Sequence, residues 1–128
     1  MYKPYHLIGL ELSISVLNAA LRGEPTGCCR AWRGDAVAVA KRALKAGEML
    51  DGEGGYTVYS KLIPAAKSLE LGGLPIGLAH HVKLSRDVPA GAILTASDVA
   101  LDAGQEAVRI RAEMERQARQ ARSAVAAE

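Results

Sequence analysis

The pattern of apolar and polar positions changes twice along the chain and divides the 128 residues into three segments. In the first segment, apolar residues recur at helical spacing from Leu10 to Leu21, and Gly23 and Pro25 follow as stop signals. This spacing predicts a helix over residues 10–22. Its polar residues fall on one narrow stripe, so most of the helix surface is apolar. The stripe consists of Glu11, Ser15, Asn18 and Arg22.

A helix that is apolar on most of its surface needs cover on several sides. A small β module offers cover on one side only. We therefore interpret residues 1–27 as the end of a preceding, catalytic-type domain, or as an element through which two copies of the chain associate.

The second segment, residues 28–102, consists of short apolar runs separated by Gly, Pro and Asp, which is typical of short strands joined by tight turns. The alternation predicts three strands, a short helix that ends before Gly72, and one helical turn capped by Thr95 and Asp98. The strands are expected at residues 36–41, 56–60 and 81–85, the short helix at 64–71 and the turn at 96–101.

The third segment, residues 103–128, is rich in Ala, Arg, Glu and Gln and has no proline, so it is expected to be helical. Oppositely charged side chains stand four residues apart along it. The expected pairs are Arg109 with Glu113, Arg111 with Glu115 and Glu115 with Arg119. Its apolar stripe is thin, which favours a solvated helix that frays toward Glu128 over a helix that binds a partner.

Charge and composition narrow the function classes. Sixteen basic and 14 acidic side chains are mixed along the chain and give a net charge of +2, so no strong field attracts nucleic acid or an acidic membrane. No apolar run has the length of a membrane-spanning helix, and the first residues do not resemble a secretory signal. Cys28 and Cys29 are adjacent, which favours free thiols. These features lead us to expect a cytoplasmic protein with no nucleic-acid or membrane partner.

Two segments 44 residues apart match without gaps: Ala40 to Asp51, and Leu84 to Thr95. The matched positions include both turn glycines, Gly47 and Gly91, and the apolar positions on either side of them. A repeat of this kind predicts a strand, a tight turn and a second short strand, used twice.

The repeated pattern, with Ala-Gly at each turn and Thr95-x-x-Asp98-Val99 near the end, resembles the SAF superfamily over residues 35–101. The resemblance implies a compact β-clip. The expected fold is therefore mainly β with flanking helices, in the α+β class. A duplicated strand–turn–strand unit forms its centre, with an apolar helix before it and a helical tail after it.

A narrower resemblance covers residues 3–101. It rests on residues 3–11, 21–27, 51–59 and 74–79, which are similar to the C-terminal third of homoserine-dehydrogenase-like oxidoreductases that carry a SAF domain. That group includes enzymes that resemble deoxyxylulose-phosphate reductoisomerase. The resemblance implies an oligomeric NAD(P)-dependent enzyme with a Rossmann domain and a catalytic domain ahead of this region.

The chain departs from that group in having no dinucleotide-binding turn. Such a turn needs Gly-x-Gly-x-x-Gly between a strand and a helix. Gly52, Gly54 and Gly55 have a different spacing and precede a predicted strand. We therefore expect no cofactor site within this chain, although NAD(P) is implied for the whole parent enzyme.

Few residues suggest chemistry of their own. Tyr5 and His6 precede the apolar helix and, with Lys61, are candidates for substrate contact; the alternative for His6 is a structural role at a domain junction. Arg42 and Arg86 occupy equivalent places in the repeat and are candidates for anion contact, because guanidinium binds phosphate bidentately; the alternative is bonding to local carbonyls or carboxylates. His80 and His81, on opposite faces of a strand, form no metal-ligand set with His6. No catalytic residue is expected.

Two hypotheses follow for the function. The first is an accessory module that caps the catalytic domain of an NAD(P)-dependent oxidoreductase and shapes its substrate access or its oligomer contacts. In it the helix over residues 7–21 binds the catalytic and Rossmann part of the parent enzyme, or a second copy of the chain. The alternative is a free-standing SAF-type module that binds a sugar acid, a sugar phosphate or a protein partner.

Overall fold

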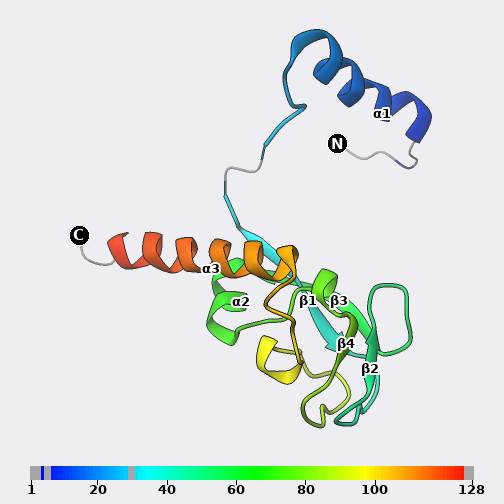
Figure 1. Ribbon diagram of the computed structural model, residues 1–128, viewed down its shortest axis with the longest axis vertical. Coiled ribbons are helices and arrows are strands. Elements are labelled where there is room, and N and C mark those ends of the chain that lie inside the picture. Colours follow the sequence, from blue (N-terminus) through cyan, green and yellow to red (C-terminus); the bar gives the residue numbers. More distant parts are fainter. Residues whose placement is uncertain (1–3, 5–6, 29–30, 126–128) are drawn as a thin grey trace. The chain divides into compact units, whose positions relative to one another are not determined.

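The structure, a computed structural model, describes residues 4, 7–28 and 31–125, with side chains to residue 122. The chain forms two compact units, Met1–Ala31 (unit 1) and Trp32–Glu128 (unit 2), each of which is described by itself (Figure 1). Together they make a small α+β protein with three α-helices and two two-stranded antiparallel sheets in the described part of the chain.

Unit 1 contains helix α1 (Ile8–Leu17), which continues as a π-helical turn, η1 (Asn18–Arg22). Gly23 ends this turn in the left-handed conformation, with φ of 65°. The prediction of a helix over residues 10–22 is confirmed, with a start two residues earlier and a wider final turn. None of the residues of α1 and η1 is buried within the described part of unit 1.

Unit 2 is built on two antiparallel strand pairs. Strand β1 (Gly34–Ala40) pairs with β3 (Val58–Pro64), from Gly34 opposite Pro64 to Ala40 opposite Val58. Strand β2 (Met49–Asp51) pairs with β4 (His80–Lys83). Helix α2 (Ala65–Leu71) follows β3 directly, and 3-10 turns cover Ile76–Leu78 (η2) and Ala96–Asp98 (η3). The three predicted strands and the short helix are present, with bounds shifted by up to four residues.

The two repeat segments face each other in a nearly two-fold symmetric arrangement. Leu44 and Val88 occupy the same position in the repeat, and each donates its amide to the carbonyl of the other, at 2.8 and 2.9 Å. The amide of Gly47 bonds the carbonyl of Leu84 at 2.8 Å, and that of Gly91 bonds Ala40 at 2.9 Å, which is the same bond in the other copy. The sequence repeat is therefore also a repeat of backbone pairing.

The symmetry extends to the segment that follows each repeat. Val58 pairs with Ala40, and Val99 pairs with Leu84, the counterpart of Ala40. At the end of each repeat, a hydroxyl donates a hydrogen bond to a carboxylate. The last repeat residue supplies the carboxylate in the first repeat and the hydroxyl in the second. Asp51 accepts from the Thr57 hydroxyl, whereas the Thr95 hydroxyl donates to Asp98 at 2.9 Å. Thr95 and Asp98 form the reciprocal cap that the sequence predicts, although the turn is shorter than predicted.

The main core lies between the two repeat segments and is wholly aliphatic, as a chain without phenylalanine requires. Its buried members come from β1, both repeat segments, the first residue of β3, the segment around η2, β4 and the bridge position after the second repeat. They are Ala38, Ala40, Leu44, Leu50, Val58, Leu74, Ala79, Val82, Leu84, Val88, Leu94 and Val99.

The turn glycines provide a matched test of the repeat. Gly47 and Gly91 both have positive φ, 82° and 76°, and both face open space. We expect Gly47→Ala and Gly91→Ala each to lower the free energy of unfolding by about 1–2 kcal/mol, because an L side chain is strained at positive φ. Gly77→Ala, also facing open space but without positive φ, should change it by less than about 0.5 kcal/mol. Urea denaturation measures all three; clearly unequal losses at Gly47 and Gly91 would contradict the symmetry.

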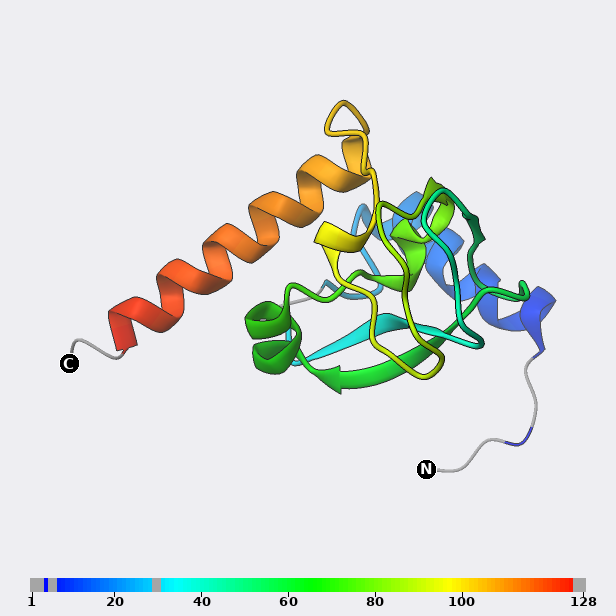
Figure 2. The same cartoon turned by 90° about the horizontal axis from the view of Figure 1, so that it is seen from below.

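The C-terminal helix α3 (Glu106–Val125) packs against its own unit along α2 (Figure 2). Arg119 and Arg122 bond the carbonyls of Leu69 and Ala66 in α2 at 3.0 and 3.4 Å. Arg111 binds Asp35 of β1 through two hydrogen bonds, at 3.0 and 2.6 Å. Arg111 is therefore held against unit 2, whereas most of the other described side chains of α3 are exposed, as expected of a solvated helix.

Candidate functional site

Arg42 and Arg86 occupy equivalent places in the two repeats, and each binds a carboxylate of unit 2. Arg42 pairs with Glu48 and also reaches the Ala43 carbonyl at 3.2 Å, and Arg86 pairs with Asp98. Burial alone would raise the pKa of Asp98, but the hydrogen bonds from the Thr95 amide and from Arg86 hold that pKa below its usual value. Both guanidinium groups remain about half exposed or more, so contact with an external anion stays a prediction.

The other predicted contact residues lie elsewhere. Lys61 is exposed on β3, opposite Val37 of β1. In the described part of the chain, Lys61 shares no carboxylate partner with Arg42 or Arg86. Tyr5 and His6 lie outside the described residues. Among the three described candidates, carboxylates hold Arg42 and Arg86 at the repeats and Lys61 lies on β3, so no contact in the described chain joins them in one site.

The glycine-rich loop after β2 is organised around the carboxylate of Asp51. Asp51 accepts hydrogen bonds from the amides of Tyr56 and Thr57, at 2.5 and 3.0 Å, and from the Thr57 hydroxyl. The Thr57 hydroxyl and these amides hold the pKa of Asp51 far below its usual value. A Cβ atom at Gly55 would lie 2.1 Å from the Asp51 carboxyl carbon, so any larger residue here would displace this carboxylate from its hydrogen bonds.

This loop does not fit a dinucleotide phosphate. Phosphate-binding loops offer free backbone amides to an anion, usually at the start of a helix. Here the amides of Tyr56 and Thr57 already bind an internal anion, the Asp51 carboxylate, and the loop leads into strand β3. An approaching phosphate would meet a negative charge at the position where free amides are needed.

Two adjacent histidines mark a bulge between β2 and β4. Met49 pairs with Lys83 and Asp51 with His80, so two residues of β4 stand opposite the single residue Leu50. The extra residue is His81, which is the single non-glycine residue with positive φ (52°) in the described chain. His80 accepts a hydrogen bond from the Glu53 amide at 3.2 Å. The bulge interrupts strict alternation, and the two imidazole rings lie 6.1 Å apart.

Strain at His81 gives a measurable difference between two glycine variants of β4. We expect His81→Gly to change the free energy of unfolding by less than about 0.5 kcal/mol, because relief of the positive φ offsets the entropy that glycine adds to the unfolded chain. Lys83→Gly, at an exposed position of the same strand, should lower the free energy of unfolding by about 1 kcal/mol. Thermal denaturation measures both, and equal losses would show that His81 carries no strain.

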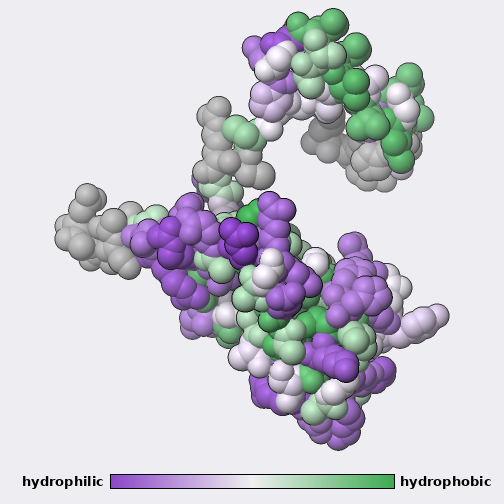
Figure 3. Space-filling view, viewed as in Figure 1, coloured by the Kyte–Doolittle hydropathy of each residue, from purple (hydrophilic) through white to green (hydrophobic). Residues whose placement is uncertain are grey.

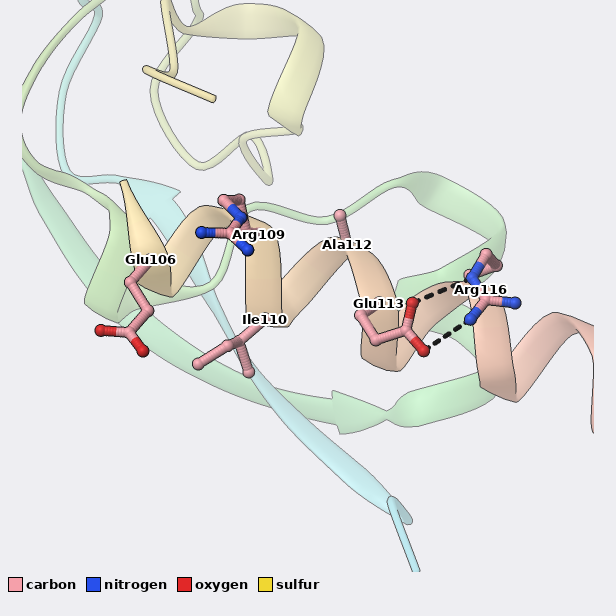
Figure 4. Close-up of a pocket in the computed structure, with 6 residues that line it drawn as sticks. All are labelled: Glu106, Arg109, Ile110, Ala112, Glu113 and Arg116. Carbon is pink, nitrogen blue, oxygen red and sulfur yellow. Dashed lines mark hydrogen bonds and ion pairs between the residues drawn. The ribbon is translucent and has the colours of Figure 1, made fainter. Parts of the chain in front are cut away.

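A shallow hollow follows one side of α3 (Figure 4). Its six described lining residues all come from this helix: Glu106, Arg109, Ile110, Ala112, Glu113 and Arg116. Glu113 accepts hydrogen bonds from Arg116 at 2.5 and 3.0 Å and from Gln117. The predicted pair of Glu113 with Arg109 is not formed among the described residues. Since polar groups from different elements do not converge here, this surface has no geometry suited to holding a small molecule.

Most of the exposed large apolar side chains of the described chain belong to unit 1. Figure 3 shows hydrophobic side chains along much of the visible face of α1. Eight large apolar side chains are between 49% and 78% exposed within the described structure. They are Leu7, Ile8, Leu10, Leu12, Ile14, Val16, Leu17 and Leu21. An apolar surface of this extent is typical of a protein-binding region.

Comparison with known proteins adds no relative: no family model and no curated protein matches this chain. None of the helices in the described residues combines the length and apolar character needed to cross a bilayer. The described part of the chain also holds no group of three or more side chains placed to bind a metal ion. Cys28 is an exposed free thiol, and Cys29 lies outside the described residues.

Proposed function

We propose that this chain is the C-terminal accessory module of a cytoplasmic, NAD(P)-dependent, homoserine-dehydrogenase-like oxidoreductase. In this proposal unit 2 is a SAF-type β-clip that caps the catalytic domain and shapes substrate access. Unit 1 is the element that binds the rest of the enzyme. The dinucleotide belongs to the Rossmann part of the parent enzyme, and this chain supplies no catalytic residue.

The observation that carries this proposal is the nearly two-fold pairing of the repeats around Leu44 and Val88. It supports the β-clip interpretation, because the segments that carry the sequence resemblance are the segments that pair. The ionisable side chains around the repeats are already used within unit 2: Lys45 binds Asp87 at 2.7 Å, and Arg42 and Arg86 bind carboxylates. These bonds support a structural role for the module, and the exposed apolar residues of α1 support a partner.

Titration with NADPH tests the proposal. We expect the purified full chain to give no saturable heat in calorimetry with NADPH up to about 1 mM, which corresponds to a binding free energy weaker than about 4 kcal/mol. The assembly that contains the tagged chain, isolated from its native cells, should bind NADPH at about one molecule per copy of the chain. Saturable binding by the chain alone, or a native assembly that binds no dinucleotide, would refute the proposal.

A second candidate, a free-standing binding module, is favoured by one observation: the described residues of unit 2 between 38 and 99 form an aliphatic core. In that case the ligand is a sugar acid, a sugar phosphate or a protein segment. Titration of the full chain with N-acetylneuraminate and with a sugar phosphate, followed by amide chemical shifts, tests it. Saturable shifts around Arg42, Arg86 or Lys61 would support this candidate, and their absence would leave the accessory role as the better explanation.

A further inference from the structure

Helix α3 is held to unit 2 by arginine side chains instead of a buried apolar face. None of its side chains is buried in the part that the structure describes, up to residue 122. Arg111 binds Asp35 of β1, and two further arginines of α3 donate hydrogen bonds to carbonyls of α2. An element with few buried apolar contacts opens at a lower free energy than the core of its domain. We therefore expect α3 to detach from unit 2 while β1 and β3 stay paired.

Two open hollows lie between α3 and the rest of unit 2. The first, of about 100 Å³, lies beside the first half of the helix, and Leu74 and Leu78 are among the residues that line it. The second, of about 280 Å³, lies beside the second half, and its lining includes Trp32, Leu69 and Ala118. A helix that belongs to a core leaves few voids larger than a water molecule. The hollows therefore support a helix that rests on unit 2 and can leave it.

The side chains that receive Arg111 have the composition of a guanidinium-binding site. Asp35 accepts two hydrogen bonds from the guanidinium group, at 3.0 and 2.6 Å, and the guanidinium carbon lies 4.6 Å from the centroid of the Trp32 ring. The Ser68 hydroxyl donates to the same carboxylate, and Asp35 and Ser68 are only 8% and 1% exposed. Paired hydrogen bonds to a carboxylate and stacking on an aromatic ring are the contacts that select a guanidinium group over an ammonium group.

The three receiving residues belong to parts of unit 2 other than α3. Trp32 lies two residues before β1, Asp35 is the second residue of β1, and Ser68 lies on α2. The Ser68 hydroxyl therefore orients the carboxylate independently of Arg111. When α3 detaches, the buried carboxylate has no cation beside it, which is unfavourable. The emptied site thus favours the entry of another guanidinium group.

We propose that Trp32, Asp35 and Ser68 form a binding site for the guanidinium group of an arginine, and that α3 is a releasable strap whose Arg111 fills this site in the free chain. An arginine that enters from outside restores both hydrogen bonds to Asp35 and the contact with Trp32, so it competes with Arg111. A lysine restores the positive charge without the paired hydrogen bonds. All the groups involved belong to unit 2, so the site is independent of the accessory role proposed above.

Fluorescence titration of the full-length Arg111→Ala variant tests the site, because Trp32 is the only tryptophan of the chain. We expect methylguanidinium to change the Trp32 emission saturably, with a Kd of about 1–10 mM. Methylammonium has the same charge without the planar donors and should bind at least about tenfold more weakly. Arg116→Ala, in which Arg111 still fills the site, is the matched control variant. The double variant Arg111→Ala/Asp35→Asn should show no saturable change.

Two further probes identify the form of arginine that the site takes. N-acetylarginine amide represents an arginine within a polypeptide, and free arginine represents the amino acid. We expect the amide to bind the Arg111→Ala variant at least as tightly as methylguanidinium does. Tighter binding of free arginine than of the amide would show that the ligand is the free amino acid.

Hydrogen exchange of the unaltered chain tests the release of α3 and does not depend on the folding of a variant. We expect α3 amides to exchange faster than those of β1. About 50 mM methylguanidinium should speed exchange in α3 by at least about threefold, because it binds the state in which α3 is detached. The same concentration of methylammonium, which matches the ionic strength, should have little effect, and exchange in β1 should not change.

Three results would overturn the proposal. The first is the absence of a saturable Trp32 response in Arg111→Ala. The second is an equal response to methylguanidinium and methylammonium, which would reduce the site to a nonspecific negative charge. The third is an α3 that is protected as strongly as β1 or that exchanges at the same rate with and without methylguanidinium, which would make α3 a permanent part of unit 2.

Discussion

Replacing Arg111 with alanine will lower the free energy of unfolding by about 3–5 kcal/mol, because it removes one member of a buried ion pair and leaves the other without its partner. Arg111 and Asp35 bond at 3.0 and 2.6 Å, and their side chains are only 13% and 8% exposed. Arg111 also lies over the Trp32 ring at 4.6 Å and binds Glu115 at 2.6 Å. Urea denaturation followed by circular dichroism measures the loss.

Arg116→Ala is the matched control for this prediction. Arg116 lies on the same helix and pairs with Glu113, but both side chains are about half exposed. Exposed ion pairs of this kind contribute about 0–1 kcal/mol to stability, so Arg116→Ala should lower the free energy of unfolding by less than about 1 kcal/mol. A loss at Arg111 no larger than that at Arg116 would show that α3 is not held to β1 by this pair.

The same pair predicts how stability depends on pH. Burial alone would raise the pKa of Asp35, but the hydrogen bonds from Arg111 and Ser68 lower it below the usual value. A carboxyl group with a lowered pKa stabilises the folded state fully above its unfolded pKa, near 3.9, and loses this contribution as pH falls through its folded pKa. In Arg111→Ala the guanidinium group no longer opposes burial, so the folded pKa of Asp35 rises and its acid-induced loss of stability shrinks. We therefore expect the difference in free energy of unfolding between parent and variant, measured at each pH, to narrow as pH falls below about 4.

Leu44→Ala will lower the free energy of unfolding by about 2–5 kcal/mol, since it opens a cavity at the point where the two repeats meet. Leu44 is 1% exposed, belongs to the main core and exchanges two backbone hydrogen bonds with Val88. Thermal and urea denaturation measure the effect. Leu62→Ala, at a 76% exposed position of β3, should change the free energy of unfolding by less than about 0.5 kcal/mol.

A double variant makes this test specific to the pairing of the repeats. Val88→Ala alone should lower the free energy of unfolding by about 1.5 kcal/mol, because it removes two buried carbons that contribute about 0.8 kcal/mol each. Because Leu44 and Val88 are direct neighbours, the loss in the double variant should differ from the sum of the two single losses by at least about 0.5 kcal/mol. If the two single losses simply add, Leu44 and Val88 are not in direct contact and the repeats do not pair as described.

Local sequence patterns were sufficient for the elements and for the repeat. Each predicted strand depends on a period of two, and the final helix depends on composition and charge spacing, all of which act over a few residues. The Thr95–Asp98 cap was also predictable, because both partners lie within one turn. The match between Ala40–Asp51 and Leu84–Thr95 indicated two segments of similar structure. It did not indicate that they pair with each other, since a sequence repeat carries no information about distance in space.

The features that sequence reasoning missed depend on contacts between distant residues or on backbone geometry. Asp35 and Arg111 are 76 residues apart, and no local pattern relates them. The positive φ of His81 follows from a bulge opposite Leu50, whereas the alternation of Val82 and Leu84 indicates a regular strand. The role of Asp51 does have a local signal in the sequence: a carboxylate beside Gly52, Gly54 and Gly55 can bond the amides that such a loop exposes.

The pairing of the two repeats is tested most directly by scalar couplings across hydrogen bonds in the NMR spectrum of the full chain. The structure predicts couplings from the amides of Leu44 and Val88 to each other's carbonyl, and equivalent couplings from Gly47 to Leu84 and from Gly91 to Ala40. Observation of all four couplings would establish the symmetric clip on which the proposed accessory role depends. Couplings in one arm without their counterparts in the other, or pairing of Gly47 and Gly91 with unrelated carbonyls, would contradict it.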